Sequence, residues 1–339
     1  MISETLEYVS QGLDLSQIHA QQVMNAIMEG EWTASQIAGL LIGLKIKGES
    51  VGEVTGFVQA MRGKAVKLDM AGQTVDTCGT GGDGHHTFNI STASAFVAAA
   101  AGVPIAKHGN RSVSSKCGSA DVLQELGVKI DMTPGDAQTC FNELGMAFLF
   151  APVYHASMKH AVAPRRELGV RTVFNMLGPM SNPAMSRRQV VGTFNRDAAD
   201  KIVRVLQNTG SEHVMVVHSA DGMDEIAVSA ETYVNEYKNG KLQSYTVTPE
   251  EFGIQRTPLE SVKGGTAKEN AAIMRSILDG TEGPFFDITV LNAGAAIYVA
   301  GSADSFSAGV EQARDVIRSG EARRLLLKMI DYSNSISQN

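Results

Sequence analysis

Cysteine is scarce in this sequence. Only Cys78, Cys117 and Cys140 occur among its 339 residues, and no two of them form a CxxC pair. No group of cysteines and histidines has the spacing of a zinc site. A small, odd set is typical of a protein from a reducing compartment, in which most cysteines serve as small buried hydrophobic residues. The sequence therefore excludes a disulfide scaffold and a zinc module.

Long hydrophobic segments are also missing. The longest apolar stretches, near residues 93–101 and 288–300, are too short or too interrupted to cross a bilayer. The N-terminal stretch MISETLEYVSQGLDLS lacks the basic start and the apolar stretch of a signal peptide. We therefore expect a cytoplasmic protein without a membrane partner.

Positive charge is in deficit. The chain has 29 Lys and Arg against 36 Asp and Glu, a net charge of -7. An acidic protein repels the phosphate backbone, so nucleic acid is not expected as a partner. With 43% hydrophobic and 19% charged residues, the chain has an ordinary globular composition and can bury a sizeable core. A local basic cluster could still bind a small phosphate ligand.

Helical signals fill the N-terminal part of the chain. Residues 33–36 and 50–53 each match a capping box, in which side chains at both ends satisfy free backbone N–H groups. Apolar side chains then recur at helical spacing, at Ile37, Leu40, Leu41, Leu44, Val54, Phe57, Val58 and Met61. We predict an all-helical domain over residues 1–70, joined by a later segment near residues 165–185.

From about residue 73, short apolar strand candidates alternate with helix candidates. Strands are predicted at residues 74–77, 103–106, 147–150 and 213–217. Helices are predicted at 92–101, from residues 119 and 133 onward, and at 196–209, 267–278, 288–300 and 305–319. This alternation predicts an α/β domain over residues 71–339, with a mostly parallel central sheet covered by helices.

A glycine-rich loop follows the first predicted strand. The segment GTGGDGHHTFNIST, residues 79–92, has four glycines before residue 85 and leads into a predicted helix. Glycine allows close backbone approach and positive φ, and successive N–H groups of such a loop can bind an anion. Short polar side chains follow where the helix dipole favours phosphate, namely Thr87, Asn89, Ser91 and Thr92. The alternative is a tight turn without a ligand.

The second polar segment, KHGNRSVSS at residues 107–115, comes after another predicted strand. Loops at the carboxyl ends of parallel strands are where α/β sheets bind ligands. Lys107 and Arg111 suit a pyrophosphate, and His108 and Asn110 are available for a more specific contact. The alternative is a solvated polar loop.

The third segment is GMDE, residues 222–225. The adjacent carboxylates of Asp224 and Glu225 repel one another unless a cation is present. Such a pair suits magnesium, which takes few carboxylates together with water and substrate phosphates. Taken alone, an Asp-Glu pair is more often an ordinary surface feature.

A fourth segment, residues 154–168, combines histidine with basic residues. A helix here would place His155 and Lys159 on one face at i and i+4. Arg165 could pair with a carboxylate. An exposed amphipathic helix with basic residues is an equally good interpretation of the pattern.

Together these segments resemble the anthranilate phosphoribosyltransferase family of the tryptophan pathway. The resemblance covers most of the chain, with its signatures at residues 79–92, 107–127, 151–184 and 222–225 in order. It implies a small helical domain, a larger α/β domain of the type shared with pyrimidine nucleoside phosphorylases, and phosphoribosyl pyrophosphate (PRPP) bound at the hinge between them. It also implies a homodimer formed through the helical domains.

The resemblance also implies site residues. Implied PRPP contacts are Gly79, Gly82, Asp83, Thr87, Asn89, Ser91, Thr92, Lys107, Ser115 and Ser119. Implied magnesium ligands are Ser91, Asp224 and Glu225. Implied anthranilate contacts are Gly79, His108, Asn110, His155, Arg165 and Pro179. Of all these, the residues expected at the catalytic centre are Lys107, His108, Asn110 and Arg165.

The implied reaction transfers the 5-phosphoribosyl group of PRPP to the amino group of anthranilate, with magnesium. The nearest alternative is a pyrimidine nucleoside phosphorylase, but the KHGNR segment and the acidic pair suit a pyrophosphate donor with magnesium better. A non-catalytic relative that binds nucleic acid should be basic, unlike this chain. A transferase for an altered aromatic acid stays open, as does an associated amidotransferase subunit.

Overall fold

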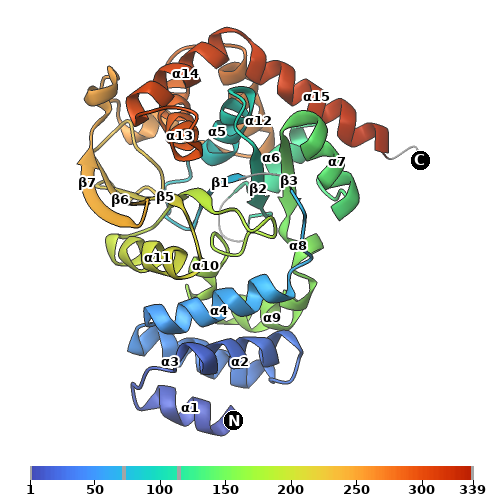
Figure 1. Ribbon diagram of the computed structural model, residues 1–339, viewed down its shortest axis with the longest axis vertical. Coiled ribbons are helices and arrows are strands. Elements are labelled where there is room, and N and C mark those ends of the chain that lie inside the picture. The colour runs from blue at the N-terminus through green and yellow to red at the C-terminus, as the bar shows by residue number, and fades with distance from the viewer. Residues whose placement is uncertain (1, 71–73, 113–115, 337–339) are drawn as a thin grey trace.

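The computed structural model describes residues 2–70, 74–112 and 116–336. It has a stack of N-terminal helices at one end and a larger α/β part at the other (Figure 1). The N-terminal helices are α1(Ile2–Ser10), α2(Gln17–Met28), α3(Ala34–Lys47) and α4(Val51–Lys64). Both predicted capping boxes are confirmed, because Thr33 and Ser50 cap α3 and α4 reciprocally with the residues three positions later.

The α/β part is built on one seven-stranded sheet of order β3-β2-β1-β4-β5-β6-β7. The strands are β1(Val75–Gly79), β2(Ile105–Gly109), β3(Met146–Phe150), β4(Arg188–Gly192), β5(His213–Ser219), β6(Thr232–Lys238) and β7(Lys241–Val247). Strands β1 to β5 run parallel to one another, whereas β6 and β7 form an antiparallel hairpin at one edge of the sheet. The predicted fold class is therefore confirmed.

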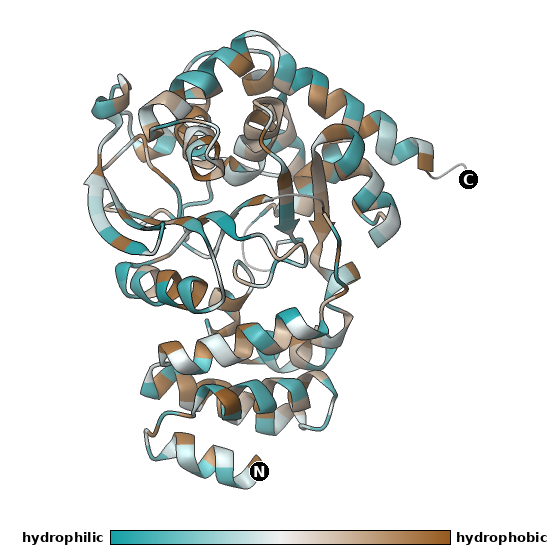
Figure 2. Ribbon diagram, in the orientation of Figure 1, coloured by the Kyte–Doolittle hydropathy of each residue, from teal (hydrophilic) through white to brown (hydrophobic). Residues whose placement is uncertain are grey.

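Helices cover both faces of this sheet (Figure 1). The longer ones are α5(Ile90–Ala100), α6(Ser119–Leu126), α7(Pro134–Leu144), α11(Arg196–Asn208), α12(Ala267–Leu278), α13(Pro284–Ala300), α14(Phe306–Arg318) and α15(Glu321–Ser335). Helices α5 and α13 pack against β1 and one another, while α11 packs against β5, β6 and α4. Figure 2 shows hydrophobic and hydrophilic residues alternating along α11, as expected for a helix with one buried face.

Two hydrophobic clusters lie on opposite faces of the sheet. Along β5, Met215 and Val217 belong to the cluster with α5 and α13, whereas Val214 and Val216 belong to the cluster that includes the N-terminal helices. This division follows from the two-residue period of a strand. The second cluster therefore joins the sheet face that carries Val214 and Val216 directly to the helical stack.

The segment between β3 and β4 also packs on the N-terminal helices. It contains α8(Ala151–Tyr154), η1(Ala156–Met158), α9(Lys159–Leu168) and α10(Phe174–Leu177). Helix α9 contacts α2 and α3, and α10 contacts α4. The side chains of Val173, Phe174 and Leu177 lie in the same cluster as those of α2 to α4. This packing supports the division into residues 1–70 with a segment near 165–185 and residues 71–339, which stays a prediction.

The expected continuous helix through His155 and Lys159 is wrong. Helix α8 ends at Tyr154, and His155 has φ of -121° and ψ of 49°, which is not helical. The His155 ring is buried, with its centroid 5.2 Å from that of His108. That contact is tertiary, so the local spacing did not indicate it.

Several elements were not predicted at all. Strand β4 begins with Arg188 and Gln189, which break its apolar pattern, and β7 is mostly exposed. The partner strand β6 and the terminal helix α15 were also missed. Among the described residues, no helix is both long and apolar enough to span a membrane.

Close packing of α2 on α4 depends on Gly56. A β-carbon on Gly56 would overlap the carbonyl oxygen of Gln17 and lie 2.9 Å from the amide nitrogen of Gln21. We therefore expect Gly56→Ala to lower the free energy of unfolding by about 1–3 kcal/mol, despite the better helix propensity of alanine. Urea denaturation followed by circular dichroism measures this change.

Gly63→Ala is the matched control in the same helix. No atom lies within 4 Å of a β-carbon placed on Gly63. This variant should leave stability unchanged or raise it by up to about 1 kcal/mol. Equal effects of the two substitutions would contradict the close approach of α2 and α4 at Gly56.

Candidate active site

The candidate site lies at the carboxyl edge of the parallel strands, where the chain segments after β1, β4 and β5 meet. The segment after β5 carries Asp224 across the end of β4. A β-carbon on Gly192, the last residue of β4, would overlap the main-chain carbonyl of Asp224. A β-carbon on Gly79, the last residue of β1, would lie 2.6 Å from Asp224 Oδ2. These two glycines therefore allow the acidic segment to reach the glycine-rich loop.

The glycine-rich loop folds around the Asp224 carboxylate. The Gly81 N–H donates to Asp224 Oδ2 at 2.8 Å. Gly81, Gly82 and Gly84 all have positive φ, of 65°, 74° and 83°. Side chains other than glycine rarely adopt this backbone. The loop is thus a tightly turned main chain, and its Gly81 amide binds a carboxylate of the protein.

Three acidic residues share this corner of the site. Burial, followed by the charge of Asp83, raises the pKa of Asp224 to about 7. Burial and the charge of Asp224 raise the pKa of Glu225 well above its usual value, and Lys107 opposes this rise. Asp83 accepts a hydrogen bond from the His85 N–H at 3.2 Å, while its Oδ2 is buried without a partner among the described residues. Carboxylates crowded in this way are stabilised by taking up a proton or by binding a cation.

This donor set fits a hard divalent cation. Magnesium binds carboxylate oxygens and keeps several positions for water and phosphate. In the described part of the chain, no three acidic, histidine or cysteine side chains form a complete ligand cluster. A cation at Asp224 and Glu225 must therefore take its remaining ligands from water, a hydroxyl group or a phosphate-bearing substrate.

Lys107 lies inside β2, rather than in the loop after it, and is 2% exposed. Its Nζ donates to the carbonyl oxygen of Thr77 at 2.6 Å and to Ser91 Oγ at 3.3 Å. Burial lowers its pKa, and the carboxylates of Asp76 and Glu225 act in the opposite direction. Lys107 thus brings a cationic group to the first turn of α5, beside the acidic corner.

Asp76 was missed by the sequence analysis, although a carboxylate within an apolar strand is a visible signal. It is fully buried in β1, and burial raises its pKa to about 6, opposed chiefly by Lys107. Its Oδ1 accepts from the His108 N–H at 3.2 Å, and its Oδ2 accepts from Asn182 Nδ2 at 2.8 Å. Asp76 therefore anchors β2 at the residues that enter the site.

The N-terminus of α5 is anchored by a distant segment. Asn89 is the N-cap residue, and its Oδ1 accepts from Asn270 Nδ2 at 3.0 Å. Thr87 pairs with Lys263 through an isolated bridge, and the Phe88 N–H donates to the Val262 carbonyl oxygen at 3.3 Å. The Thr92 hydroxyl oxygen is buried without a partner among the described residues. The Ile90 and Thr92 N–H groups donate to the carbonyl oxygens of Phe88 and Asn89, and the positive end of the helix dipole favours an anion here.

Asn292 of α13 plays a comparable role for the acidic pair. Its Oδ1 accepts from the Ile226 N–H at 3.0 Å, and its Nδ2 donates to the Ile226 carbonyl oxygen at 2.9 Å. These bonds hold the peptide that directly follows Glu225. Neither Asn292 nor Asn270 could be identified from local sequence, because their partners are more than sixty residues away.

The segment after β2 is closed by its own polar contacts. Ser119 Oγ bonds to both the N–H and the carbonyl oxygen of Asn110, each at 3.2 Å. Arg111 forms an ion pair with Asp121 at 2.9 Å, so this arginine is already engaged. Ser115, predicted as a PRPP contact, lies outside the described residues. Asn110 and Ser119 are therefore brought together, while their contacts with ligands stay a prediction.

Two neighbouring histidines form an aromatic wall, in which His155 is buried and His108 is partly buried. His108 and His155 lie with ring centroids 5.2 Å apart. Burial, followed by His155, lowers the pKa of His108 to about 3, and burial also lowers the pKa of His155. Both rings are therefore neutral at pH 7, and they offer flat, uncharged surfaces.

Arg165 and Pro179 make no recorded contact with the acidic corner in the described part of the chain. The Arg165 guanidinium lies over the Phe174 ring, with Cζ 4.9 Å from its centroid. The Pro179 carbonyl oxygen accepts from Gln189 Nε2 at 2.8 Å, which places Pro179 beside β4. Both residues belong to the segment between β3 and β4 that packs on the helical stack.

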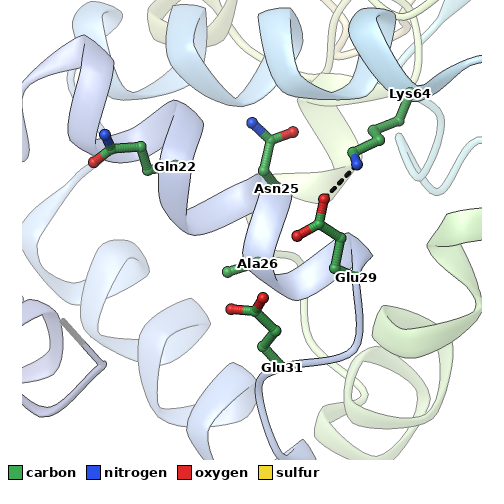
Figure 3. Close-up of a pocket in the computed structure, with 6 residues that line it drawn as sticks. All are labelled: Gln22, Asn25, Ala26, Glu29, Glu31 and Lys64. Atoms are coloured by element: carbon green, nitrogen blue, oxygen red, sulfur yellow. Dashed lines mark hydrogen bonds and ion pairs between the residues drawn. The ribbon is translucent and has the colours of Figure 1, made fainter.

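A surface hollow on the helical stack does not belong to this site (Figure 3). It is lined mostly by polar side chains of α2, of the turn after α2 and of the last residue of α4, and Lys64 and Glu29 form an ion pair there. None of the residues that line it was predicted as a site residue. The acidic pair, Lys107 and the glycine-rich loop lie at the sheet edge instead.

Two family models match this chain. Residues 71–323 match the α/β domain of a glycosyl transferase family, and residues 3–65 match the helical bundle domain of that family. The two matches correspond to the sheet-containing part and the helical stack described above.

Similar proteins share one name. The chain is 49% identical to an anthranilate phosphoribosyltransferase of Clostridium kluyveri, over 98% of this chain and 100% of the relative. It is 50% identical to that of Nitrosomonas eutropha, over 93% of each chain.

Solved structures agree with this likeness. The crystal structure of anthranilate phosphoribosyltransferase from Thermus thermophilus has a TM-score of 0.92 and 42% identity, over 97% of this chain and 99% of that one. The yeast enzyme in complex with PRPP and Mg shares the fold, with a TM-score of 0.88 and 24% identity over 98% of each chain. Near-complete coverage at this identity means that the chain belongs to the anthranilate phosphoribosyltransferase family.

Proposed function

We propose that this protein transfers the 5-phosphoribosyl group of PRPP to the amino group of anthranilate, releasing pyrophosphate, in tryptophan biosynthesis. The observation that carries the proposal is the meeting of the glycine-rich loop, Lys107, the N-terminus of α5 and the Asp224–Glu225 pair at one sheet edge. Each of these groups suits a phosphate or its counter-ion. Family membership supplies the identity of the two substrates.

Departure of pyrophosphate from the anomeric carbon is the step that needs most help, because negative charge grows on the leaving oxygen. Lys107, whose Nζ lies 3.3 Å from Ser91 Oγ, and the positive end of the α5 dipole would stabilise that charge. Ser91, Asp224 and Glu225 would hold magnesium, which when bound supplies further neutralisation of the pyrophosphate. Loop amides and hydroxyl groups would orient the phosphates.

The acceptor nitrogen of anthranilate is an aromatic amine and is neutral at pH 7. It can attack without prior loss of a proton, so we assign no obligatory general base. The low pKa of His108 agrees with this assignment, since a neutral ring of low basicity is a poor proton acceptor. We propose that His108 and His155 pack against the aromatic ring of anthranilate, beside Gly79, Asn110 and Pro179. Arg165 would bind the carboxylate of anthranilate.

We extend the proposal to a cytoplasmic homodimer formed through the helical stack. Ile18 of α2 and Ile46 of α3 are 70% and 82% exposed. Apolar side chains so exposed are common at protein interfaces, although single ones also occur on monomers. Sedimentation velocity measures the assembly state.

The function is tested with anthranilate, PRPP and magnesium. Anthranilate fluorescence should fall in the presence of enzyme, mass spectrometry should identify N-(5-phosphoribosyl)anthranilate, and EDTA should abolish the change. No turnover by a folded protein that binds PRPP would refute anthranilate as the acceptor and leave the donor site standing. Phosphorolysis of a pyrimidine nucleoside would favour the related phosphorylase activity instead.

The metal assignment is tested by the double substitution Asp224→Asn and Glu225→Gln. The variant should lose about a hundredfold or more in turnover, because the charge of the leaving group is no longer offset. Steady-state kinetics over a magnesium titration measures the loss. Near-normal turnover at saturating magnesium would contradict the assignment.

Glu250→Gln with Glu251→Gln is the matched control. These residues form another adjacent acidic pair, but both are exposed and lie on η2(Pro249–Phe252). Their removal should leave turnover and its magnesium dependence unchanged. A similar loss in both double variants would indicate a general effect of charge rather than a metal site.

Arg165→Ala tests the acceptor site. Loss of a charge-assisted contact to the carboxylate of anthranilate should raise its KM by roughly 30- to 150-fold, with little change in the KM for PRPP. Arg166→Ala, which changes the exposed neighbour in the same helix, should leave both values near those of the wild type. Equal changes in both KM values for Arg165→Ala would refute the role.

A further inference from the structure

The Arg171 guanidinium lies against the glycine-rich loop at Gly82. A β-carbon on Gly82 would be 3.2 Å from both Nε and Nη2 of Arg171, and 3.5 Å from its Cζ. The guanidinium group therefore rests against the main chain of the loop at a position where any side chain would meet it. Gly82 also has a positive φ of 74°, so the loop turns directly beneath this group.

The Arg171 guanidinium stacks on an aromatic ring and has no acidic partner among the described residues. Its Cζ lies 4.7 Å from the ring centroid of Phe194, just after β4. Within the described residues, no hydrogen bond or ion pair of the Arg171 side chain is recorded, whereas Arg111, Arg314 and Arg318 each form one with a carboxylate. A stacked guanidinium keeps its N–H donors free for a planar contact with phosphate oxygens.

The main chain of Arg171 belongs to the other part of the molecule. Lys45 Nζ of α3 donates to the Arg171 carbonyl oxygen at 2.9 Å. The following residues Val173 and Phe174 are buried in the cluster with α2 to α4. Arg171 is thus anchored on the helical stack while its side chain reaches a loop of the sheet-containing part.

We infer that Arg171 is a further PRPP-binding residue, which contacts phosphate oxygens beside Gly82 of the glycine-rich loop. Lys107 approaches the same region from within the sheet, so the two cations would enclose the bound phosphates. Because Arg171 is anchored on the helical stack, this contact also links phosphate binding to the position of that stack. The inference rests on the proposed function for the identity of the phosphate ligand.

Isothermal titration calorimetry with the full chain and magnesium tests the inference, with inorganic pyrophosphate and ribose 5-phosphate as separate probes. Arg171→Ala should weaken the binding of one probe by about tenfold to a hundredfold. The weakened probe identifies which phosphate group of PRPP is contacted. Arg171→Lys keeps the charge but loses the planar fork, so it should fall between the wild type and Arg171→Ala.

Arg196→Ala is the matched control. Arg196 is exposed and stacks on Tyr233 with Cζ 4.9 Å from the ring centroid, the same arrangement without a recorded contact to the glycine-rich loop. Its affinities for both probes should match those of the wild type. If Arg171→Ala also binds both probes within twofold of the wild type, the inference is overturned and Arg171 only stacks on Phe194.

Turnover with anthranilate is measured in parallel to separate this inference from the proposed function. A wild-type protein that turns over, together with unchanged phosphate affinities in Arg171→Ala, would overturn the role of Arg171 alone. A wild-type protein that does not turn over, together with weakened pyrophosphate binding in Arg171→Ala, would support the phosphate contact and refute the acceptor.

Discussion

The position of the Asp224 carboxylate depends on glycines, which have no side chain, at the ends of the neighbouring strands. Its main chain crosses β4 at Gly192, its Oδ2 faces Gly79 of β1, and the same oxygen accepts the Gly81 N–H. A methyl group at Gly192 or Gly79 would displace the acidic segment from the glycine-rich loop. This contact joins segments 143 residues apart, and the acidic corner exists only because of it.

Electrostatics sets the second constraint. Asp83, Asp224 and Glu225 crowd one corner, and the pKa of Asp224 rises to about 7 because burial and like charge both disfavour ionisation. Crowded carboxylates lower the stability of the folded protein unless a cation is bound. Such unfavourable arrangements are common at functional sites. Asn292 holds the main chain of Ile226 by a buried amide contact, and Asn270 holds the side chain of the N-cap residue Asn89. The fold thus maintains repelling groups in position before any ligand arrives.

The segment between β3 and β4 would supply the second wall of the proposed site. It packs on the N-terminal helices through Phe174 and Leu177, yet it carries Arg165 and Arg171. Both guanidinium groups stack on aromatic rings and have no carboxylate partner among the described residues. Stacking restricts a long flexible side chain and leaves its N–H donors available. The side chain therefore loses less conformational entropy when an anionic substrate binds.

Local sequence was sufficient for features that depend on neighbouring residues. The capping boxes at Thr33 and Ser50, the turned glycine-rich loop, the polar start of α5 and the parallel α/β class all follow from short-range patterns. Resemblance to a family then indicated which of these polar segments act together. Tertiary structure decided what no local pattern encodes: the break in helix at His155, the burial of Asp76 beneath Lys107, and the crossing of Asp224 over Gly192. Each depends on packing between distant segments, because burial and close approach are properties of the assembled fold rather than of residue spacing.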